Sequence, residues 1–431
     1  MQLVAYGAQD VYLTGNPQIT FFKVVYRRHT NFSMESIQQT LIGNSASGTG
    51  GRVVATISRN GDLLYKTFIV LPPMNAPGIL SAEYGHQIID HIDVEIGGQI
   101  IDRHYGHFME AWSELTEPNP TRSIGYLTGL QYTNNLLNNT FLPHTAGSYI
   151  ENRFTNFQRM ACAGGVNGSL GGGVTFDPVQ IDQPLTIPLR FWFCKEPGLA
   201  LPLIALQYHE VKVIIQFSKA LQHDKPELWC DYIYLDTDER RRFAQVSHEY
   251  LIEQVQVERF TTKETKFTCK LKFNHPVKEL IWFKTTNTWN TTSDNVAFFT
   301  LLLDTDVNKC SLKLNGHERF APRPMQYFTR DQPYLYHTSS GVDRNILAPV
   351  SWPQGSNYSD TIGVYSFCLK PEEHQPSGTC NFSRLDSVEL IIEGINTELT
   401  GDDGPGVLNV CAINYNVLRI MSGMGGLAYS N

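Results

Sequence analysis

The sequence has few charged residues, and those that it has are predominantly acidic. Only 18% of the 431 residues are charged and 42% are hydrophobic, against about 25% charged in an average soluble protein. The 34 lysines and arginines face 42 aspartates and glutamates, which gives a formal net charge of -8. So apolar a chain must fold, and its charge has the wrong sign for a protein that coats nucleic acid. We therefore expect no direct binding of nucleic acid.

Long apolar runs and paired cysteines are also lacking. The longest apolar runs, 296–303 and 199–206, fall far short of the roughly 20 residues of a membrane-spanning helix. The first ten residues have neither the basic start nor the apolar stretch of a secretory signal, which predicts folding in a reducing compartment. Eight cysteines stand singly without a CxxC pair, and this favours buried free thiols over disulfides or zinc ligands.

Strand-forming segments dominate what is present. Turn residues such as Gly97-Gly98 and Asn315-Gly316 separate runs that are rich in β-branched and aromatic residues. Two segments, 105–115 and 199–208, are predicted as helices, the first from its apolar i, i+3, i+4 spacing. The pattern predicts an all-β fold of antiparallel sandwiches with short helices. The predicted strands are 34–42, 52–58, 63–71, 88–96, 188–194, 211–217, 267–273, 388–392 and 407–420.

An internal repeat indicates how many domains there are. The length suggests about three average domains or two large ones. A tight hairpin at 94–99 (VEIGGQ) recurs at 312–317 (LKLNGH), and the segments 190–195 and 209–215 are answered by 365–370 and 386–392. The landmarks recur in the same order, so we expect one fold built twice, with the break just after 236–243. Long insertions at 115–183 and 332–360 are expected to be exposed loops that carry contacts.

No motif for catalysis or cofactor binding stands out. The glycine-rich segments 164–173 and 423–426 do not match a phosphate-binding loop. His86, His91, His104 and His107 lie close together in sequence but on alternating strand faces, which disfavours a metal site. We expect no cofactor, no metal and no enzymatic activity. A carbohydrate-active β-sandwich remains an alternative, since carboxylates from distant segments could converge in a cleft.

Blocks spread over the whole chain resemble a known family. They include 2–23 (QLVAYGAQDVYLTGNPQITFFK), 57–63 (ISRNGDL), 197–211 (PGLALPLIALQYHEV), 375–384 (QPSGTCNFSR) and 414–429 (NYNVLRIMSGMGGLAY). These segments resemble the major capsid proteins of nucleocytoplasmic large DNA viruses, in particular those of algal viruses, the phycodnaviruses. The alternative within that lineage is a minor capsid paralogue.

The resemblance implies a double jelly roll, that is, two eight-stranded antiparallel sandwiches in tandem. On this basis we expect an N-terminal arm at 1–25, a first jelly roll at 26–242, a linker at 243–253 and a second jelly roll at 254–431. Members of the family form homotrimeric, pseudo-hexagonal capsomers that tile an icosahedral shell over an internal lipid membrane. The implied partners are further copies of the chain, neighbouring capsomers, and minor capsid and penton proteins. The expected location is the outer shell of the virion, after folding in the host cytoplasm.

Two groups of residues are singled out as sites. Phe21, Phe22 and Tyr26 in and beside the arm are expected to anchor it to a neighbour. The resemblance also makes glycosylation plausible at sequon asparagines in the outer loops, and we expect it at Asn138, Asn167, Asn290 and Asn357. Two further sequons, Asn31 and Asn381, lie inside blocks that resemble the family, near the expected framework strands, and are poorer candidates.

Overall fold

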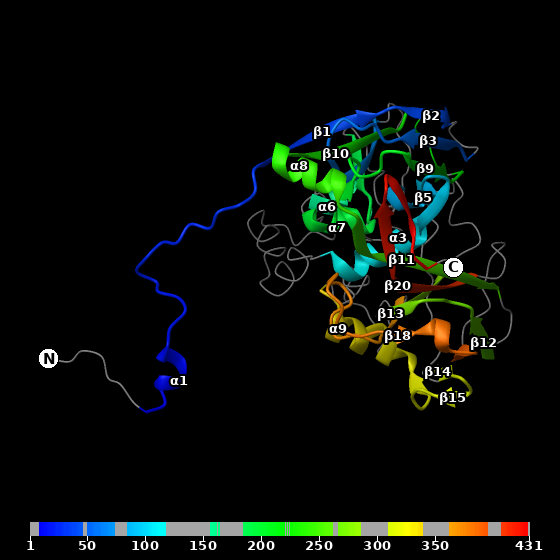
Figure 1. Cartoon of the computed structure of the whole chain (residues 1–431). Coiled ribbons are helices and arrows are strands. Elements are labelled where there is room, and N and C mark those ends of the chain that lie inside the picture. Colours follow the sequence, from blue (N-terminus) through cyan, green and yellow to red (C-terminus); the bar gives the residue numbers. More distant parts are fainter. Residues whose placement is uncertain are drawn as a thin grey trace, which may run out of the picture.

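The computed structural model describes residues 8–45, 50–73, 84–117, 156–161, 163, 184–219, 221, 223, 225–261, 266–285, 309–338, 362–394 and 407–429. The described chain forms two β-sandwiches, each with two antiparallel sheets (Figure 1). The first half of the chain supplies the first sandwich and the second half supplies the other.

The first sandwich consists of sheets I and II. Sheet I has the order β1-β10-β4-β7 and sheet II the order β3-β9-β5-β6, with the short strands β2 and β8 added to β3 and β4. The bounds are β1 Phe32–Gln39, β2 Leu41–Asn44, β3 Arg52–Thr56, β4 Leu63–Leu71, β5 Ile89–Ile96, β6 Gln99–Tyr105, β7 Leu185–Pro188, β8 Leu201–Pro202, β9 Val211–Phe217 and β10 Glu227–Leu235.

The second sandwich consists of sheets III and IV. Sheet III has the order β11-β20-β13-β17 and sheet IV the order β12-β19-β14-β15, and β16, β18 and β21 are short additions. The bounds are β11 His248–Thr261, β12 Lys266–Leu271, β13 Pro276–Thr285, β14 Lys309–Leu314, β15 His317–Glu318, β16 Arg323–Pro324, β17 Ile362–Ser366, β18 Cys380–Asn381, β19 Val388–Glu393, β20 Val407–Met421 and β21 Met424–Leu427.

Both sandwiches have the same connectivity. If the short added strands are left aside and the rest are numbered along the chain, sheets I and III both have the order 1-8-3-6. Sheets II and IV both have the order 2-7-4-5. Eight strands wound in this way form a jelly roll, so the expected double jelly roll is confirmed. The repeat is also confirmed, because the hairpins β5–β6 and β14–β15 occupy equivalent places, as do β9 and β19.

Helices are short and lie in the connections. The predicted helix 105–115 is confirmed as α3, whereas α8 was not foreseen because its sequence TDERRRFAQ has no apolar stripe. Asp236 caps α8 by accepting a hydrogen bond from the amide of Thr237. The helical elements are α1 Val11–Thr14, α2 Tyr84–Gln87, α3 Gly106–Thr116, α6 Asn156–Ala161, α7 Trp192–Lys195, η2 Pro197–Leu199, α8 Thr237–Gln245, the π-helix η3 Tyr327–Asp331, α9 Gln332–Tyr336 and η4 Phe382–Arg384.

Two predictions of local structure were wrong. The segment 199–208, expected as a helix, forms β8 and turns, because Pro202 cannot donate a helical hydrogen bond and the amide of Ile204 donates to Asp62 in the first sandwich instead. The segment 188–194, expected as a strand, leaves β7 at Pro188 and forms α7 from Trp192. Its apolar residues are buried on all sides, and a short, wholly buried run has no periodicity that separates strand from helix.

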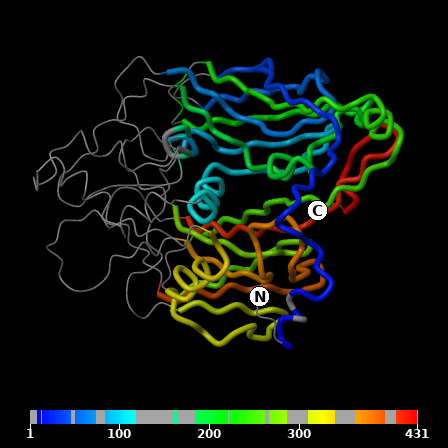
Figure 2. The backbone as a smooth tube through the Cα atoms, turned by 90° about the vertical axis from the view of Figure 1, so that its left-hand side faces the viewer, coloured from blue at the N-terminus to red at the C-terminus, as the bar shows by residue number. Residues whose placement is uncertain are grey.

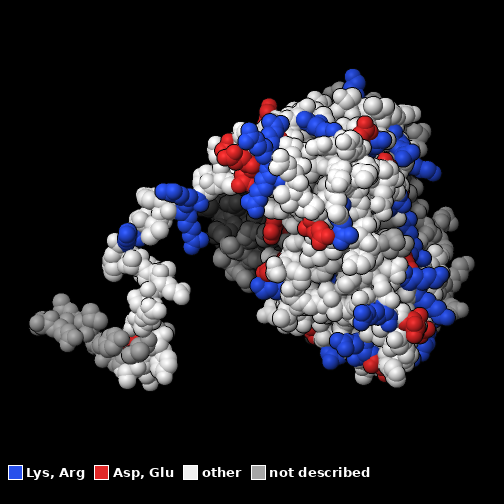
Figure 3. All heavy atoms as spheres, viewed as in Figure 1, with Lys and Arg blue, Asp and Glu red and all other residues white. Residues whose placement is uncertain are grey.

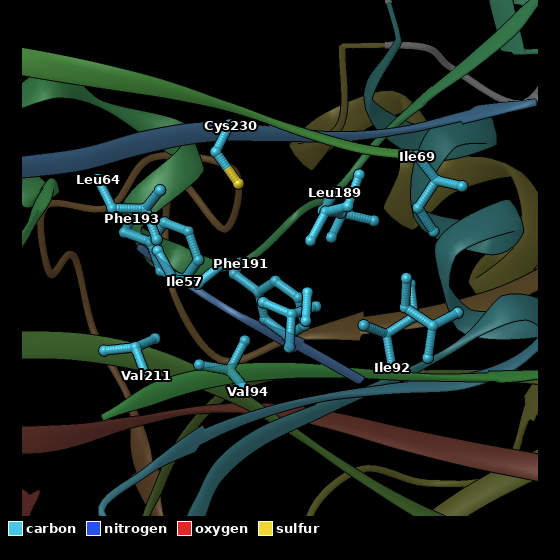
Figure 4. Close-up of a cluster of buried hydrophobic side chains, with 14 of the residues drawn as sticks. Ile57, Leu64, Ile69, Ile92, Val94, Leu189, Phe191, Phe193, Val211 and Cys230 are labelled. Atoms are coloured by element: carbon cyan, nitrogen blue, oxygen red, sulfur yellow. The ribbon is translucent and has the colours of Figure 1, made fainter. Parts of the chain in front are cut away.

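The four sheets are stacked in the order I, II, III, IV (Figure 2). Side chains of sheet I such as Leu64 and Cys230 face Val94 and Val211 of sheet II across the first core (Figure 4). A second apolar core fills the space between sheets III and IV. The joint between the two sandwiches is apolar as well, because Ile252 from β11 and the end of β20 add side chains to the first core. Buried surface therefore continues through the whole stack.

Helix α3 completes this joint. It follows β6 of the first sandwich and packs Phe108 and Trp112 against the outer face of sheet III, where they contact a cluster that includes Ile281 and Phe283. Beside the helix, the guanidinium of Arg259 on β11 lies 4.8 Å from the ring centroid of Tyr105 on β6. The amide of Val255 also donates to Asp102 at 3.1 Å. The connection after the fifth strand of the first jelly roll is thus the element that docks on the second.

Candidate assembly surfaces

Residues 8–31 form an arm that extends away from the two sandwiches (Figure 1). The three predicted anchors on it are almost fully exposed: Phe21 at 89%, Phe22 at 98% and Tyr26 at 89%. Tyr12, Ile19, Val24 and Val25 are exposed in the same segment. Monomeric soluble proteins rarely expose such a concentration of large apolar side chains unless a partner covers them. The arm is therefore the first candidate assembly surface.

The arm also differs from the rest of the chain in charge. It carries Lys23, Arg27 and Arg28 but only one acidic residue, Asp10, and the basic side chains are visible where it approaches the sandwiches (Figure 3). Since residues 1–31 thus have a charge of +2 within a chain of -8, the remainder carries -10. A basic, apolar arm is suited to an acidic partner surface.

The four predicted glycosylation sites, Asn138, Asn167, Asn290 and Asn357, lie outside the described residues. The two poorer candidates are described, and both are exposed. Asn381 is engaged in local structure, since its side chain caps η4 by accepting a hydrogen bond from the amide of Ser383 at 3.1 Å.

A buried ionic cluster spans the joint between the sandwiches. Lys195, at the end of α7 in the first sandwich, donates to Glu253 on β11. Lys278 on β13 donates to the other carboxylate oxygen of Glu253 at 2.7 Å, and Nδ1 of His374 lies 3.3 Å from that oxygen. Burial alone would raise the pKa of Glu253, but the neighbouring lysines and His374 outweigh it and hold the pKa well below its ordinary value. The carboxylate is therefore charged and links the two halves of the chain.

Trp112 lies between this cluster and a second one. The ammonium of Lys195 is 5.3 Å from its ring centroid, and the ring of His337, at the end of α9, meets it edge-on at 6.1 Å. His337 is buried between two carboxylates, with its Nε2 3.0 Å from Glu279 and its Nδ1 3.1 Å from Glu372. Burial lowers the pKa of His337, but the two carboxylates raise it further, to about 9. The second sandwich thus holds a buried histidinium against the helix that the first one contributes.

Of the four histidines grouped in the sequence, His86, His91 and His104 pair individually with carboxylates, and His107 packs against the rings of Tyr105 and Phe283. His86 contacts Glu110 at 2.5 Å in a fully buried pair, and His104 contacts Asp102 at 2.9 Å. In the described parts of the chain, no group of three or more histidine, cysteine, aspartate or glutamate side chains is arranged to hold a metal ion. The arrangement therefore favours structural pairs in the first sandwich and its loops.

The structure also bears on the cysteines and on the lack of long apolar runs in the sequence. Of the seven described cysteines, five are buried, as predicted, and burial raises the pKa of Cys269 to about 12. Among the residues that the structure describes, no helix has the length and the apolar character that a membrane crossing requires.

Sequence reasoning did not find the ionic cluster. Lys195, Glu253 and Lys278 come from α7, β11 and β13, and each stands in a segment where a single charge next to apolar residues is unremarkable. The only signal in the sequence was that Glu253 follows the apolar residues Leu251 and Ile252 within a run predicted as a linker, where apolar neighbours indicate burial. That run, 243–253, contains the end of α8 and the first residues of β11.

Comparisons with known proteins match the chain along its whole length. The profile of the family described as the major capsid protein N-terminus matches residues 20–236, and the profile of the large eukaryotic DNA virus major capsid protein matches residues 239–426. The chain is 46% identical to the major capsid protein of Pyramimonas orientalis virus, with 100% of this chain and 99% of the relative aligned. It is 37% identical to that of Paramecium bursaria Chlorella virus 1 over the same shares of the two chains.

Solved structures agree with these similarities. The chain matches a chain of the PBCV-1 virus capsid with a TM-score of 0.67 and 32% identity, which covers 96% of this chain and 100% of the other. The major capsid protein of Faustovirus has a TM-score of 0.60 over 96% of this chain and 94% of its own, and its 14% identity shows a shared fold alone.

Proposed function

The chain belongs to the family of major capsid proteins of large eukaryotic DNA viruses, and from this premise we propose that three copies close into a pseudo-hexagonal capsomer. Its role is structural, and its place is the capsid shell of the virion. The observation that carries the trimer is the identical strand order of the two jelly rolls. Two equivalent units per chain give six around a closed threefold ring, so that similar contacts can surround the capsomer.

The jelly rolls are proposed to span 26–242 and 254–431, with the arm at 1–25 and the linker at 243–253. In support, Ile252 packs into the core of the first sandwich although its strand continues into the second. Glu253 likewise bonds to Lys195 of the first half and Lys278 of the second. A segment held from both sides would fix the angle between the jelly rolls, which a rigid capsomer needs.

The trimer is tested by the mass of the purified chain in solution. Sedimentation at micromolar concentration is expected to give three times 48.7 kDa, about 146 kDa. A stable monomer would overturn the trimer. A particle reconstruction with this chain at the threefold capsomer positions is the second expectation, and a low copy number in purified virions would favour a minor capsid paralogue instead.

The arm is proposed to bind neighbouring proteins of the shell: other capsomers, minor capsid proteins or penton proteins. Its exposed Phe21, Phe22 and Tyr26 and its basic residues support this. Deletion of residues 1–31 is expected to leave the trimer intact, because the first strand of the first sandwich begins at Phe32, and to prevent assembly of shells. A deletion that assembles normally would contradict the proposal. The shell is further proposed to lie over an internal lipid membrane that the chain does not span.

Glycosylation is proposed at Asn138, Asn167, Asn290 and Asn357, the sequon asparagines that the family resemblance leads us to expect in outer loops. Peptide mass mapping of the protein from virions is expected to find added sugar mass on at least one of these four. Asn31 and Asn381 serve as internal references that are expected to be unmodified. Sugar found only on the references, or on no asparagine, would refute the assignment.

A further inference from the structure

The strands β11, β20 and β21 form a ribbon that lies across one end of the first sandwich (Figure 2). Strand β20 pairs with β13 up to Asn414, and from Leu418 to its end it pairs with β11 on one side and β21 on the other. Side chains alternate between the two faces of a strand, and Leu418 and Ile420 belong to the core of the first sandwich. The opposite face of the ribbon is therefore directed away from that core. We call it the ribbon face, and it consists of Glu249, Leu251, Val417, Arg419, Met421, Met424 and Gly426.

The tip of the ribbon face is apolar and exposed. Met421 and Met424 lie opposite each other in the β20–β21 hairpin and are 49% and 52% exposed. The two residues of the turn between them, Ser422 and Gly423, both have positive φ, at 53° and 81°. The amide of Tyr208 donates to the carbonyl of Gly423 at 3.0 Å and so ties the turn to the first sandwich. The hairpin thus holds two flexible thioether side chains on a fixed support, where no described segment of the chain covers them.

The arm leaves the molecule at the same end. It continues into Phe32 of β1, which pairs with Leu235 at the end of β10. From there α8 and Val246 lead into β11, whose His248 pairs with Ile420 beside the methionines. The aromatic residues of the arm, at positions 21, 22 and 26, stand six to eleven residues before Phe32. An extended chain of that length spans about 20–40 Å, which is enough to reach the ribbon face of an adjoining molecule.

The arm and the ribbon face match in chemistry. Methionine makes favourable sulfur contacts with aromatic rings and adapts its flexible side chain to them, and the arm presents three such rings. Lys23 follows Phe22, and Glu249 on the ribbon face is 60% exposed. The exposed pair of Glu249 with Arg419 is a weak contact, so this carboxylate can also bind Lys23. The large apolar side chains of residues 19–26 are 72–98% exposed in their own chain, so a second copy is the fitting partner.

We infer that residues 19–26 in the arm of one copy dock on the ribbon face of a second copy in the adjoining capsomer. Burial of the three aromatic rings covers about 450–750 Å² of the arm, which is less than the roughly 800 Å² per partner of a standard interface. Each proposed capsomer has three arms and three ribbon faces, so weak contacts act together and none has to hold alone. The inference rests on the proposed function and specifies which neighbour the arm binds and where.

Binding of an isolated arm peptide tests the inference. A fluorescent peptide of residues 17–31 is titrated with the full-length chain, and the anisotropy is measured. In that chain Phe21, Phe22 and Tyr26 are replaced by serine, so that its own arms do not compete. We expect saturable binding that Met421→Asp and Met424→Asp each weaken by about tenfold. Both methionines are about half exposed, so these variants should fold and keep the sedimenting mass of the parent chain.

Two controls separate this contact from nonspecific binding. Tyr334→Asp should leave binding unchanged, because Tyr334 is 75% exposed on α9, which packs beside β17 at the opposite edge of sheet III from β11. A peptide with the same three serines keeps the basic residues and should not bind. If the chain is a trimer but the peptide does not bind, or binds both aspartate variants as tightly as their parent, the inference is wrong while the proposed capsomer stands. A monomeric wild-type chain would overturn the proposed function itself.

Photo-cross-linking in assembled shells identifies the partner of the arm. With p-benzoylphenylalanine in place of Phe22, irradiation is expected to give a covalent dimer of about 97 kDa, twice 48.7 kDa. The cross-link is expected on the tryptic peptide 420–431, which holds both methionines. Separate capsomers at nanomolar concentration are expected to give no dimer. Dimers in such separate capsomers, or cross-links in shells only to a different protein, would overturn the inference.

Discussion

Glu253→Gln removes one charge from the centre of the joint between the jelly rolls and preserves the size of the side chain. In the folded protein, Glu253 is the carboxylate that both Lys195 and Lys278 contact. The side chain of Lys278 is 1% exposed, so water cannot replace the lost partner. The variant therefore leaves a buried ammonium opposite a neutral amide.

The loss of stability caused by Glu253→Gln follows from the burial of the ion pair. Removing one partner of a buried ion pair typically costs about 3–5 kcal/mol, whereas exposed pairs contribute about 0–1 kcal/mol. Because the folded-state pKa of Glu253 is lowered, its stabilisation is complete above the ordinary pKa of glutamate, near 4.5, and is lost as the pH falls below it. We expect the variant to lose about 3–5 kcal/mol at pH 7, and the difference from wild type to shrink in acid.

Guanidinium denaturation followed by tryptophan fluorescence measures this loss, since Trp112 packs against Lys195 in the joint. Wild type and variants must be compared at one protein concentration, because assembly itself adds stability. Glu249→Gln is the matched control: it lies on the same strand and pairs with Arg419 at 2.8 Å, but both side chains are at least half exposed. If Glu253→Gln costs no more than Glu249→Gln, the cluster does not hold the joint and the argument fails.

Two further substitutions have expected outcomes. His337→Gln removes two charge-assisted hydrogen bonds, to Glu279 and Glu372, at about 1.5–3 kcal/mol each. The pKa of His337 is raised to about 9, so the stability that the charged imidazole contributes is complete below pH 6.5 and is lost as the pH rises through 9. The unfolding midpoints of the variant and of wild type should therefore converge between pH 7 and 10. A difference between the two midpoints that stays constant over this range would contradict the prediction. Gly97→Ala places a Cβ 2.3 Å from Nδ1 of His209 at a φ of +58°, whereas Gly98→Ala at +89° meets open space. Both substitutions should lower the stability of the fold, but thermal unfolding should show that Gly97→Ala costs about 1–3 kcal/mol more than Gly98→Ala. Equal losses of stability would contradict the close contact between Gly97 and His209.

Local structure was predictable where a pattern of fixed period decided it. Strand β4 was predicted with its observed bounds, and the Gly97-Gly98 hairpin forms as expected because both glycines adopt positive φ. The apolar spacing of 105–115 correctly gave α3. The segments 188–194 and 199–208 were predicted wrongly, since their structure depends on contacts with β4 and Asp62 that no local period encodes.

The candidate surfaces divide in the same way. Phe21, Phe22 and Tyr26 could be singled out from the sequence because the resemblance implies an N-terminal arm, and large apolar side chains in such a segment are a local property. The ionic cluster could not, since it brings together α7, β11 and β13, whose proximity follows only from the stacking of the sheets.

The sequence by itself determined that the chain is an all-β protein with one fold built twice, and its blocks identified the capsid family. These properties depend on alternation, turn residues and segment identity, all of which are written along the chain. Only the tertiary structure decided which surfaces are covered. Trp112 and Tyr334 lie on helices that follow equivalent strands, yet the first is buried on sheet III and the second is exposed. The difference arises because α3 packs on sheet III, which distant segments of the chain form, whereas no described segment packs over Tyr334.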